Sequence, residues 1–234
     1  NNILSGTGTI DMSVGNLPHL LNLIGTTNAI GTLATSPTGA STVDYKGTNQ
    51  TVFASPNYSN LVISNTGIKT LQGNSVIGKD LSITGGTFDL GTTATTLGVS
   101  GNTSITDSLR YNGTTTKTVT LSGDFSGAGI IDMSGSSLSH FLNLGGINNS
   151  IGTYKPGSAS TVDYVRNGNQ NIFTSDFYQN LQISGTGVKT LNSDITASGT
   201  LTMLAGNINS NGNILKLTNS SAIAINHTNG TVIG

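Results

Sequence analysis

The sequence predicts an all-β protein, built as a parallel β-helix (β-solenoid) in which short strands stack coil upon coil. Three observations favour this fold class. The chain of 234 residues is crowded with Thr, Val and Ile, which prefer strands. Its 32 Gly, together with Asn and Ser, interrupt it every few residues, so no segment has the periodicity of a long helix. Apolar and polar residues alternate over short runs, as in strands with one buried face.

The chain consists of two tandem copies of one unit. STVDY occurs at residues 41–45 and again at 160–164, and 19 of the 31 aligned positions that begin there are identical. Upstream, IDMS at residues 10–13 returns at 131–134. We assign copy one to residues 1–121 and copy two, which is incomplete, to residues 122–234. We expect a continuous solenoid that is an excerpt of a longer array.

Positions that stay apolar in both copies predict the buried face of the strands. The positions between them accept polar residues, for example Val62 against Gln182, so alternation with period two places the apolar set inward. Ile68 and its equivalent Val188 belong to this apolar set. The predicted repeat core comprises Leu61, Ile63, Leu71, Leu81, Ile83, Leu181, Ile183, Leu191, Leu201 and Met203.

Tandem β-sandwich domains of about 120 residues are the alternative architecture. A sandwich needs bulky core anchors, whereas aromatic residues make up 5% of this chain and Trp is absent. A solenoid has a thin core that Val, Ile and Leu can fill, and ladders of Asn or Thr satisfy its polar corners. With an assumed coil of about twenty residues and a rise of about 4.8 Å per coil, the chain forms a rod of about a dozen coils.

Composition excludes several classes of partner. The net charge is −1 and nine Lys and Arg are scattered singly, so we expect no nucleic-acid binding. No run of 18 apolar residues exists, so we expect no membrane span in this segment. The absence of Cys fits an exposed surface as well as a cytoplasm and does not decide the compartment.

We expect no cofactor and no metal. The run GNSVIGKD at residues 73–80 begins like a phosphate-binding loop, but Asp80 stands where Ser or Thr must hold Mg²⁺. His19 and His140 repeat as packing or surface positions, and His227 is isolated. The ten acidic residues, all Asp, are spread singly, which leaves only a calcium site built across coils as an alternative.

An enzyme is the principal rival to a structural role, because many β-helix proteins degrade polysaccharides with paired carboxylates. Asp44 and Asp163 are the candidate acids, but they merely repeat within STVDY, and we predict a structural unit used twice and no catalytic residues. An ice-binding face would need Thr rows at constant coil spacing, and the Thr-x-Thr runs of this chain have none.

Three runs resemble a known family. They are YKGTNQTV at 45–52, YSNLVISNTGIKTL at 58–71 and LSITGGTFDLGTTATTLGVSGN at 81–102. These runs resemble the repeats of giant cell-surface proteins of the Bacteroidota, including the Flavobacterium-type gliding-motility adhesins. The resemblance covers nearly all of both copies, although residues 12–40 and 133–159 match it less well.

The resemblance implies an extracellular, β-helical filament at the bacterial cell surface, exported by the type IX secretion system. We therefore expect an adhesive, structural segment that contacts surfaces or polysaccharides weakly and multivalently, with neighbouring repeats of the same chain as its other partners. Asp107-Ser108-Leu109 matches the O-glycosylation acceptor of the resembled group, which makes Ser108 a candidate carrier of a glycan.

Overall fold

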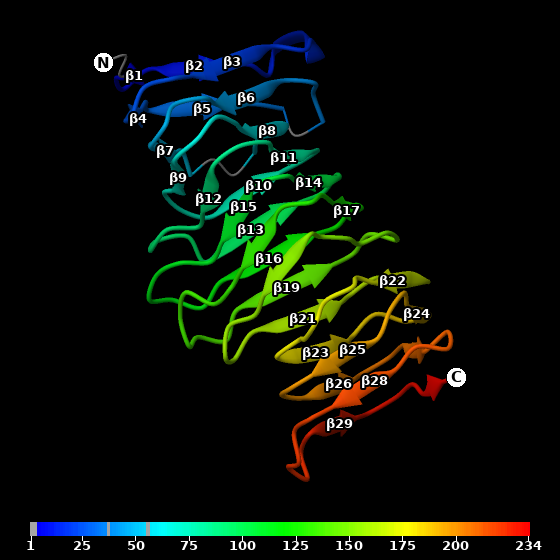
Figure 1. The fold of residues 1–234 in the computed structure, drawn as a ribbon. Coiled ribbons are helices and arrows are strands. Elements are labelled where there is room, and N and C mark those ends of the chain that lie inside the picture. The colour runs from blue at the N-terminus through cyan, green and yellow to red at the C-terminus, as the bar shows by residue number, and fades with distance from the viewer. Residues whose placement is uncertain (1–3, 37, 55–56) are drawn as a thin grey trace.

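The computed structural model describes residues 4–36, 38–54 and 57–234, with the backbone alone at residue 16. The described chain is an all-β solenoid of about 11 turns, stacked from the N-terminus at one end to the C-terminus at the other (Figure 1). Every strand pairing in it is parallel, as when one coil lies directly on the next. The predicted solenoid is therefore confirmed, and the β-sandwich alternative is wrong.

The strands contain two to four residues each. One short 3₁₀ turn, η1 (Val14–Asn16), interrupts them near the N-terminus. Three sheets account for most of the strands and define three faces of the rod. Face 1 begins with β3 (Leu20–Leu23), β6 (Thr42–Tyr45), β8 (Asn60–Ile63), β11 (Leu81–Ile83), β14 (Thr103–Ile105) and β17 (Phe125–Ser126). Face 2 contains β7 (Gln50–Val52), β9 (Ile68–Leu71), β12 (Thr87–Asp89), β15 (Ser108–Arg110), β18 (Ile130–Asp132) and β20 (Thr153–Lys155).

Face 3 is the longest sheet and runs without a break across the boundary between the copies. Its strands are β10 (Ser75–Ile77), β13 (Thr96–Val99), β16 (Thr118–Leu121), β19 (Phe141–Leu144), β21 (Thr161–Tyr164), β23 (Asn180–Ile183), β26 (Leu201–Met203) and β29 (Ile225–His227). Shorter sheets complete the stack at its two ends. They contain β1 (Leu4–Ser5) with β4 (Asn28–Ala29), β2 (Thr9–Asp11) with β5 (Thr32–Ala34), β22 (Gln170–Ile172) with β24 (Val188–Leu191), β27 (Asn207–Asn209) and β30 (Val232–Ile233), and β25 (Ile195–Ala197) with β28 (Leu215–Leu217).

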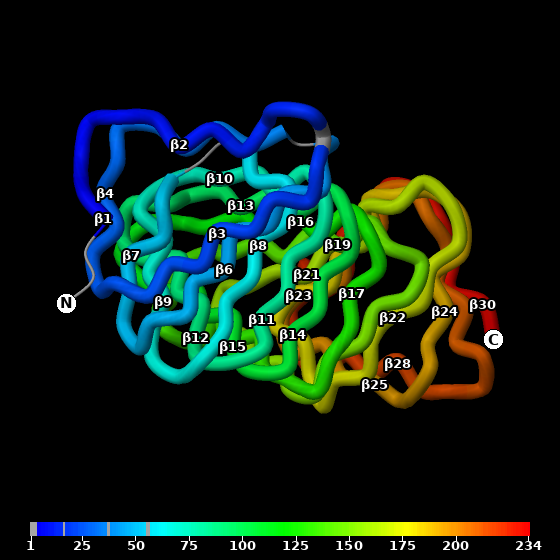
Figure 2. Tube along the Cα trace, turned by 90° about the horizontal axis from the view of Figure 1, so that it is seen from above, coloured from blue at the N-terminus to red at the C-terminus, as the bar shows by residue number. Residues whose placement is uncertain are grey.

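The later sheets continue faces 1 and 2. A bridge from Phe125 to Asn149, followed by an Asn149 Nδ2–H bond to the Asn171 carbonyl at 3.2 Å, links β17 to β22 along face 1. Tyr178 pairs with Ala197 of β25 and its ring lies 5.8 Å from that of Tyr154 in β20, which links the strands of face 2. Each coil thus visits faces 1, 2 and 3 in turn. Figure 2, seen from above, shows the coils enclosing a common interior, with the last coils offset to one side.

The coil length agrees with the assumed value of about twenty residues. Residues that pair in register on successive coils are 18 to 24 apart in the sequence, for example Thr42 with Asn60 and Leu4 with Asn28. In register, Leu61 pairs with Leu81, and Leu81 in turn with Thr103. The inward positions of successive strands therefore lie one above another, and each coil covers the core residues of its neighbour.

The two copies are rotated relative to each other around the rod axis. Starting from β6, the chain passes β8, β11, β14 and β17 on face 1 and returns to this face at Asn149, which completes five coils. It then crosses face 2 at β20 and arrives at the second STVDY strand, β21, on face 3. The second STVDY strand therefore lies one face short of six coils from the first, on face 3 at residues 161–164, whereas the first lies on face 1 at residues 42–45. Equivalent outward residues of the two copies consequently point in different directions.

The ten predicted repeat-core residues are all buried, with exposed fractions of 0 to 3%. They belong to one continuous hydrophobic cluster that follows the rod. Burying each such side chain contributes about 1.5–3 kcal/mol to stability. Each added coil therefore increases the stability of the rod by a small amount. The STVDY segments contribute one strand each, in which Val43 and Tyr45, or Val162 and Tyr164, face the core.

One prediction of side-chain direction is wrong. Ile68 was expected inward, but it is 38% exposed, and the neighbouring Lys69 is fully buried in its place. Lys189 repeats this arrangement in copy two. The Nζ of Lys189 donates hydrogen bonds to the carbonyls of Arg166, Gly168 and Thr186 at 2.7–2.8 Å, which is why a lysine occupies an inward position. Burial lowers the pKa of this ammonium to about 8, with the charge of Arg166 acting in the same direction.

Tyrosines also contribute more to the interior than their number suggested. All six are buried: Tyr45, Tyr58, Tyr111, Tyr154, Tyr164 and Tyr178. The hydroxyl of Tyr45 accepts a hydrogen bond from the Phe53 amide at 3.0 Å, and the hydroxyl of Tyr58 donates to the Phe53 carbonyl at 2.9 Å. A solenoid core can hold large aromatic residues where a turn offers their hydroxyls a backbone partner.

Candidate functional site

The outer surface of face 3 carries a row of polar side chains in register. From β16 to β29, successive strands place at equivalent outward positions Thr120, Asn143, Asp163, Gln182, Thr202 and Asn226, whereas β10 and β13 have Val76 and Gly98 there. Asn143 Nδ2 donates to Thr120 Oγ1 at 3.3 Å, and Gln182 Nε2 donates to Asp163 Oδ2 at 2.6 Å. The row repeats at the strand spacing of about 4.8 Å and presents amide and hydroxyl groups along the rod.

A second polar surface lies where β22 and β24 continue face 1. A groove of about 320 Å³ is lined there by Ile147, Asn148, Asn169, Gln170, Asn171, Thr190 and Asn192. The Nε2 of Gln170 donates to the carbonyls of Leu144 and Gly146 at 3.1 and 2.9 Å. Its Oε1 is buried and has no hydrogen-bond partner among the described residues. This groove extends the amide-rich character of the outer surface to another face.

Face 2 differs, because its outward row carries charges of alternating sign. Asp89, Arg110, Asp132 and Lys155 follow one another in register on consecutive coils. The Arg110 guanidinium forms an ion pair with the almost fully buried carboxylate of Asp89. The row carries no net charge, and its one ion pair among the described residues joins two consecutive coils.

Asp89 and Asp132 lie two strand spacings apart, about 9.6 Å, near the separation that inverting glycosidases use. The oxygens of Asp89, however, accept hydrogen bonds from the Gly91 amide at 2.6 Å, from Arg110 Nε at 2.8 Å and from Asn112 Nδ2 at 3.2 Å. Asp132 Oδ1 accepts from the amide and hydroxyl of Ser134 at 2.9 and 2.6 Å. These bonds stabilise the local turns and compete with any role in proton transfer.

The two sequence-predicted candidate acids are not brought together. Asp44 lies in β6 on face 1, where Ser64 donates its hydroxyl proton to Oδ1 at 2.6 Å. Asp163 lies in β21 on face 3 and accepts from Gln182 and from the Ser184 hydroxyl. Both point outward, are almost fully covered, and bind the strand of the next coil.

His140 lies in a buried cluster that sequence reasoning treated as an ordinary packing or surface position. Its Nδ1 accepts a hydrogen bond from the Lys117 amide at 3.1 Å, so the ring proton of the neutral form resides on Nε2. Nε2, 2.8 Å from Ser136 Oγ, therefore donates to that hydroxyl and cannot act as its base. Burial lowers the pKa of His140, and the nearby Lys117 ammonium lowers it further.

The other histidines and the phosphate-loop candidate serve as local structure. His19 Nε2 contacts the Val14 carbonyl at 3.1 Å, and His227 Nε2 contacts the Gly230 carbonyl at 2.7 Å. Residues 73–80 form strand β10 and a turn that leads into β11, with no helix after them. Within the described part of the chain, no three His or Asp residues gather as a metal would require, and no helix is long and apolar enough to cross a membrane.

Ser108 is the first residue of β15 on face 2 and is half-buried. The preceding Asp107 accepts a hydrogen bond from the Gly86 amide at 2.7 Å, which fixes the turn in front of the strand. Glycosylation of Ser108 stays a prediction.

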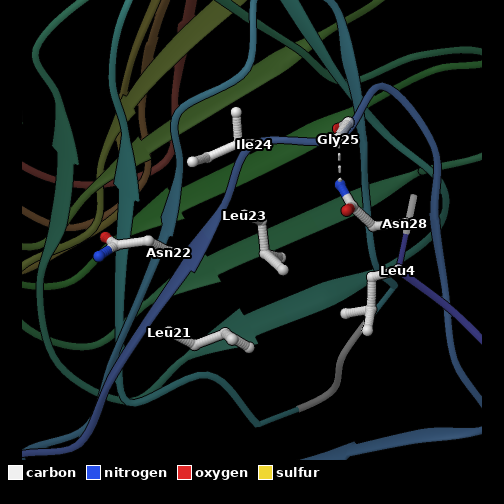
Figure 3. A pocket seen from close by; sticks show the side chains of 7 residues that line it. All are labelled: Leu4, Leu21, Asn22, Leu23, Ile24, Gly25 and Asn28. Carbon is white, nitrogen blue, oxygen red and sulfur yellow. Dashed lines mark hydrogen bonds between the residues drawn. The ribbon is translucent and has the colours of Figure 1, made fainter. Parts of the chain in front are cut away.

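An apolar cleft borders β3, the terminal strand of face 1 (Figure 3). Leu4, Leu21, Leu23 and Ile24 line it, and Asn28 donates its side-chain amide to the Gly25 carbonyl at 3.3 Å. The leucines occupy the positions that a stacked coil covers elsewhere in the rod. This cleft is the uncovered end of the aliphatic core within the described residues.

Comparisons of the chain with protein families, with curated proteins and with solved structures found no match.

Proposed function

We propose that this chain is a structural and adhesive segment of an extracellular bacterial surface filament. It projects the filament from the cell and attaches weakly, at many points, to polysaccharide or other polar surfaces. The observation that carries the proposal is the in-register row of face 3, which places an amide or hydroxyl group on five of the six strands from β16 to β29. Repeated weak contacts on one rigid rod increase avidity steeply with their number.

The resemblance to Bacteroidota surface repeats supports the placement of this filament at the cell surface, with export by the type IX secretion system and a part in gliding. A rod in which each coil rests on its neighbours extends by simple repetition. The buried and hydrogen-bonded state of Asp89, Asp44 and Asp163 supports a non-enzymatic role.

The proposal is tested with beads that carry the chain at high and at low density, pulled across films of neutral polysaccharide. We expect retention to rise more steeply than the number of attached chains. Replacing two residues of the face 3 row, Thr202→Ala with Asn226→Ala, should reduce retention. The matched control, Ser82→Ala with Ser104→Ala on face 1, should leave it unchanged. Retention that is absent at every density contradicts the proposal.

A β-helical polysaccharide-degrading enzyme is the second candidate, favoured by the separation of Asp89 and Asp132. Incubation of the chain with plant and algal polysaccharides, followed by measurement of new reducing ends, distinguishes the two functions. Hydrolysis that disappears in Asp132→Asn, in a variant that unfolds like the parent chain, would establish the enzyme and remove the structural proposal.

A further inference from the structure

Face 2 is interrupted on its second half, and the interruption creates a cavity. β20 is the terminal strand of its sheet, and the next coil continues on this face with a loop, residues 174–177, in place of a strand. A cavity of about 210 Å³ lies between β20 and this loop, with Thr153, Tyr154, Ser175, Asp176 and Phe177 among its lining residues. Its volume is below that of sites for drug-sized ligands and suits one small polar unit.

Phe177 gives the cavity an aromatic wall. Its side chain is 48% exposed, and it is the one aromatic residue among those described that is classed as exposed. Elsewhere in the rod, Phe and Tyr lie in the interior or are partly covered. The face of an aromatic ring carries partial negative charge and attracts the C–H groups on the apolar side of a sugar ring.

Polar groups face the same cavity from both of its sides. Asp176 is exposed, and neither ion pair among the described residues involves it, so its two oxygens can accept hydrogen bonds from adjacent hydroxyls of a ligand. Thr153 and Thr174 add exposed hydroxyls. The free edge of β20 adds backbone groups with no strand beside them.

The loop and the floor of the cavity are held in place before any ligand binds. The Ser175 hydroxyl donates to the Phe177 carbonyl at 3.1 Å, which fixes the turn. The ring of Tyr154 packs against Phe173 and Tyr178, with ring centres 5.6 and 5.8 Å away. A rigid site loses little entropy when it binds a ligand.

We propose that this cavity binds one neutral sugar residue of a polysaccharide, with the ring stacked on Phe177 and two neighbouring hydroxyls donating to Asp176. The inference rests on the proposed attachment to polysaccharide and assigns one specific subsite within it. The Asp176 carboxylate repels uronic acids and sulfated sugars, so the site selects neutral polymers. Copy one has Pro56 and Asn57 in place of Asp176 and Phe177, so the subsite belongs to copy two alone.

Affinity electrophoresis of the full 234-residue chain tests the proposal, with dextran, galactomannan and xyloglucan as neutral probes and alginate as the anionic probe. We expect at least one neutral polymer to retard the chain and alginate to retard it less. Phe177→Asn, which introduces the copy one residue, should weaken that retardation about tenfold. Asp176→Asn should weaken it as well, whereas Phe177→Tyr, which keeps the ring, should retain it.

Ile68→Asn is the matched control, because it removes an exposed apolar side chain from the same face away from the cavity. If the parent chain is retarded and both Phe177→Asn and Asp176→Asn behave like it, the subsite is disproved and the proposed polysaccharide attachment stands. If no polymer retards the parent chain, the proposed attachment itself fails. Stronger retardation by alginate than by every neutral polymer overturns the assigned specificity.

Discussion

The hydroxyl groups of Tyr164 and Tyr178 meet inside the rod, 3.3 Å apart, and both bond to the Phe173 backbone. The Phe173 amide donates to Tyr164 Oη at 3.0 Å, and Tyr178 Oη donates to the Phe173 carbonyl. Because the proton of Tyr178 is used in that bond, Tyr164 must donate its own proton to Tyr178 Oη. Tyr45, Tyr58 and Phe53 form the same network in copy one.

This network explains why the tyrosine of STVDY recurs, and it predicts a specific cost. Tyr164→Phe leaves the buried Phe173 amide without an acceptor, so we expect the free energy of unfolding to fall by about 1–3 kcal/mol. Urea denaturation measures the change. Tyr111→Phe is the control, because the Tyr111 hydroxyl has only a long 3.4 Å contact with the Phe141 carbonyl. Equal losses in the two variants would show that the network adds nothing.

The turn between β23 and β24 requires a glycine at position 187, where φ is 81°. We call such a turn, which lies directly on the turn of the adjacent coil, a stacked corner. A Cβ at this position would also lie 2.5 Å from the backbone of Gly168 in the adjacent coil. We therefore expect Gly187→Ala to lower the free energy of unfolding by more than about 1 kcal/mol, as measured by urea denaturation.

Gly98 offers the opposite case for comparison. It lies in strand β13, where an added Cβ would meet only a Val76 methyl group, at 3.9 Å. Gly98→Ala should be neutral, or should stabilise by about 0.4–1 kcal/mol through loss of freedom in the unfolded chain. A smaller effect at Gly187 than at Gly98 would contradict the stacked-corner explanation.

Much of this architecture follows from local sequence, and the rest depends on neighbouring coils. Alternation places Leu61 and Ile63 inward because a strand has period two. Strand β9 keeps this alternation, but with Lys69 and Leu71 inward and Ile68 outward. The inward lysine is tolerated because its ammonium donates to the carbonyls of Asn65 and Thr66, at 2.8 and 2.6 Å, in the turn before its strand. Residue type alone gives no sign that this lysine, and not its apolar neighbour Ile68, faces the core.

The candidate site was beyond prediction for a related reason. Phe177 and Asp176 differ from their copy one equivalents, which is a signal in the sequence. Their common cavity, however, depends on where β20 ends in the preceding coil. To predict that contact one must know which residues of successive coils lie side by side. The sequence does not give this, because the coils differ in length.

His140 predicts a dependence of stability on pH. Burial holds its pKa below the ordinary value near 6.5, so folding favours the neutral ring. This contribution is fully present above about pH 6.5 and is lost as the pH falls toward the lowered pKa. We expect the free energy of unfolding to decrease between pH 7 and pH 5, with a smaller decrease in His140→Gln. A profile that is the same in His140→Gln and the parent would assign the loss to other groups.

The rotation of the copies predicts the distance between equivalent positions. Thr66 lies between β8 and β9, at the corner from face 1 to face 2, and Thr186 lies between β23 and β24, at the corner from face 3 to face 1. Spin labels at Thr66→Cys and Thr186→Cys should therefore be separated both along the rod, by about 27 Å at about 4.8 Å per coil, and across it. Thr174 begins the face 2 loop after β22, five coils along from Thr66 and beside the same corner. Labels at Thr66→Cys and Thr174→Cys should therefore give a distance close to the axial value alone, about 24 Å. If the first pair also gave only its axial distance, the copies would be aligned and every repeat of an array would present the same face. With the rotation, three successive copies would present equivalent surfaces in three directions, which suits the proposed attachment to a surface on any side of the rod.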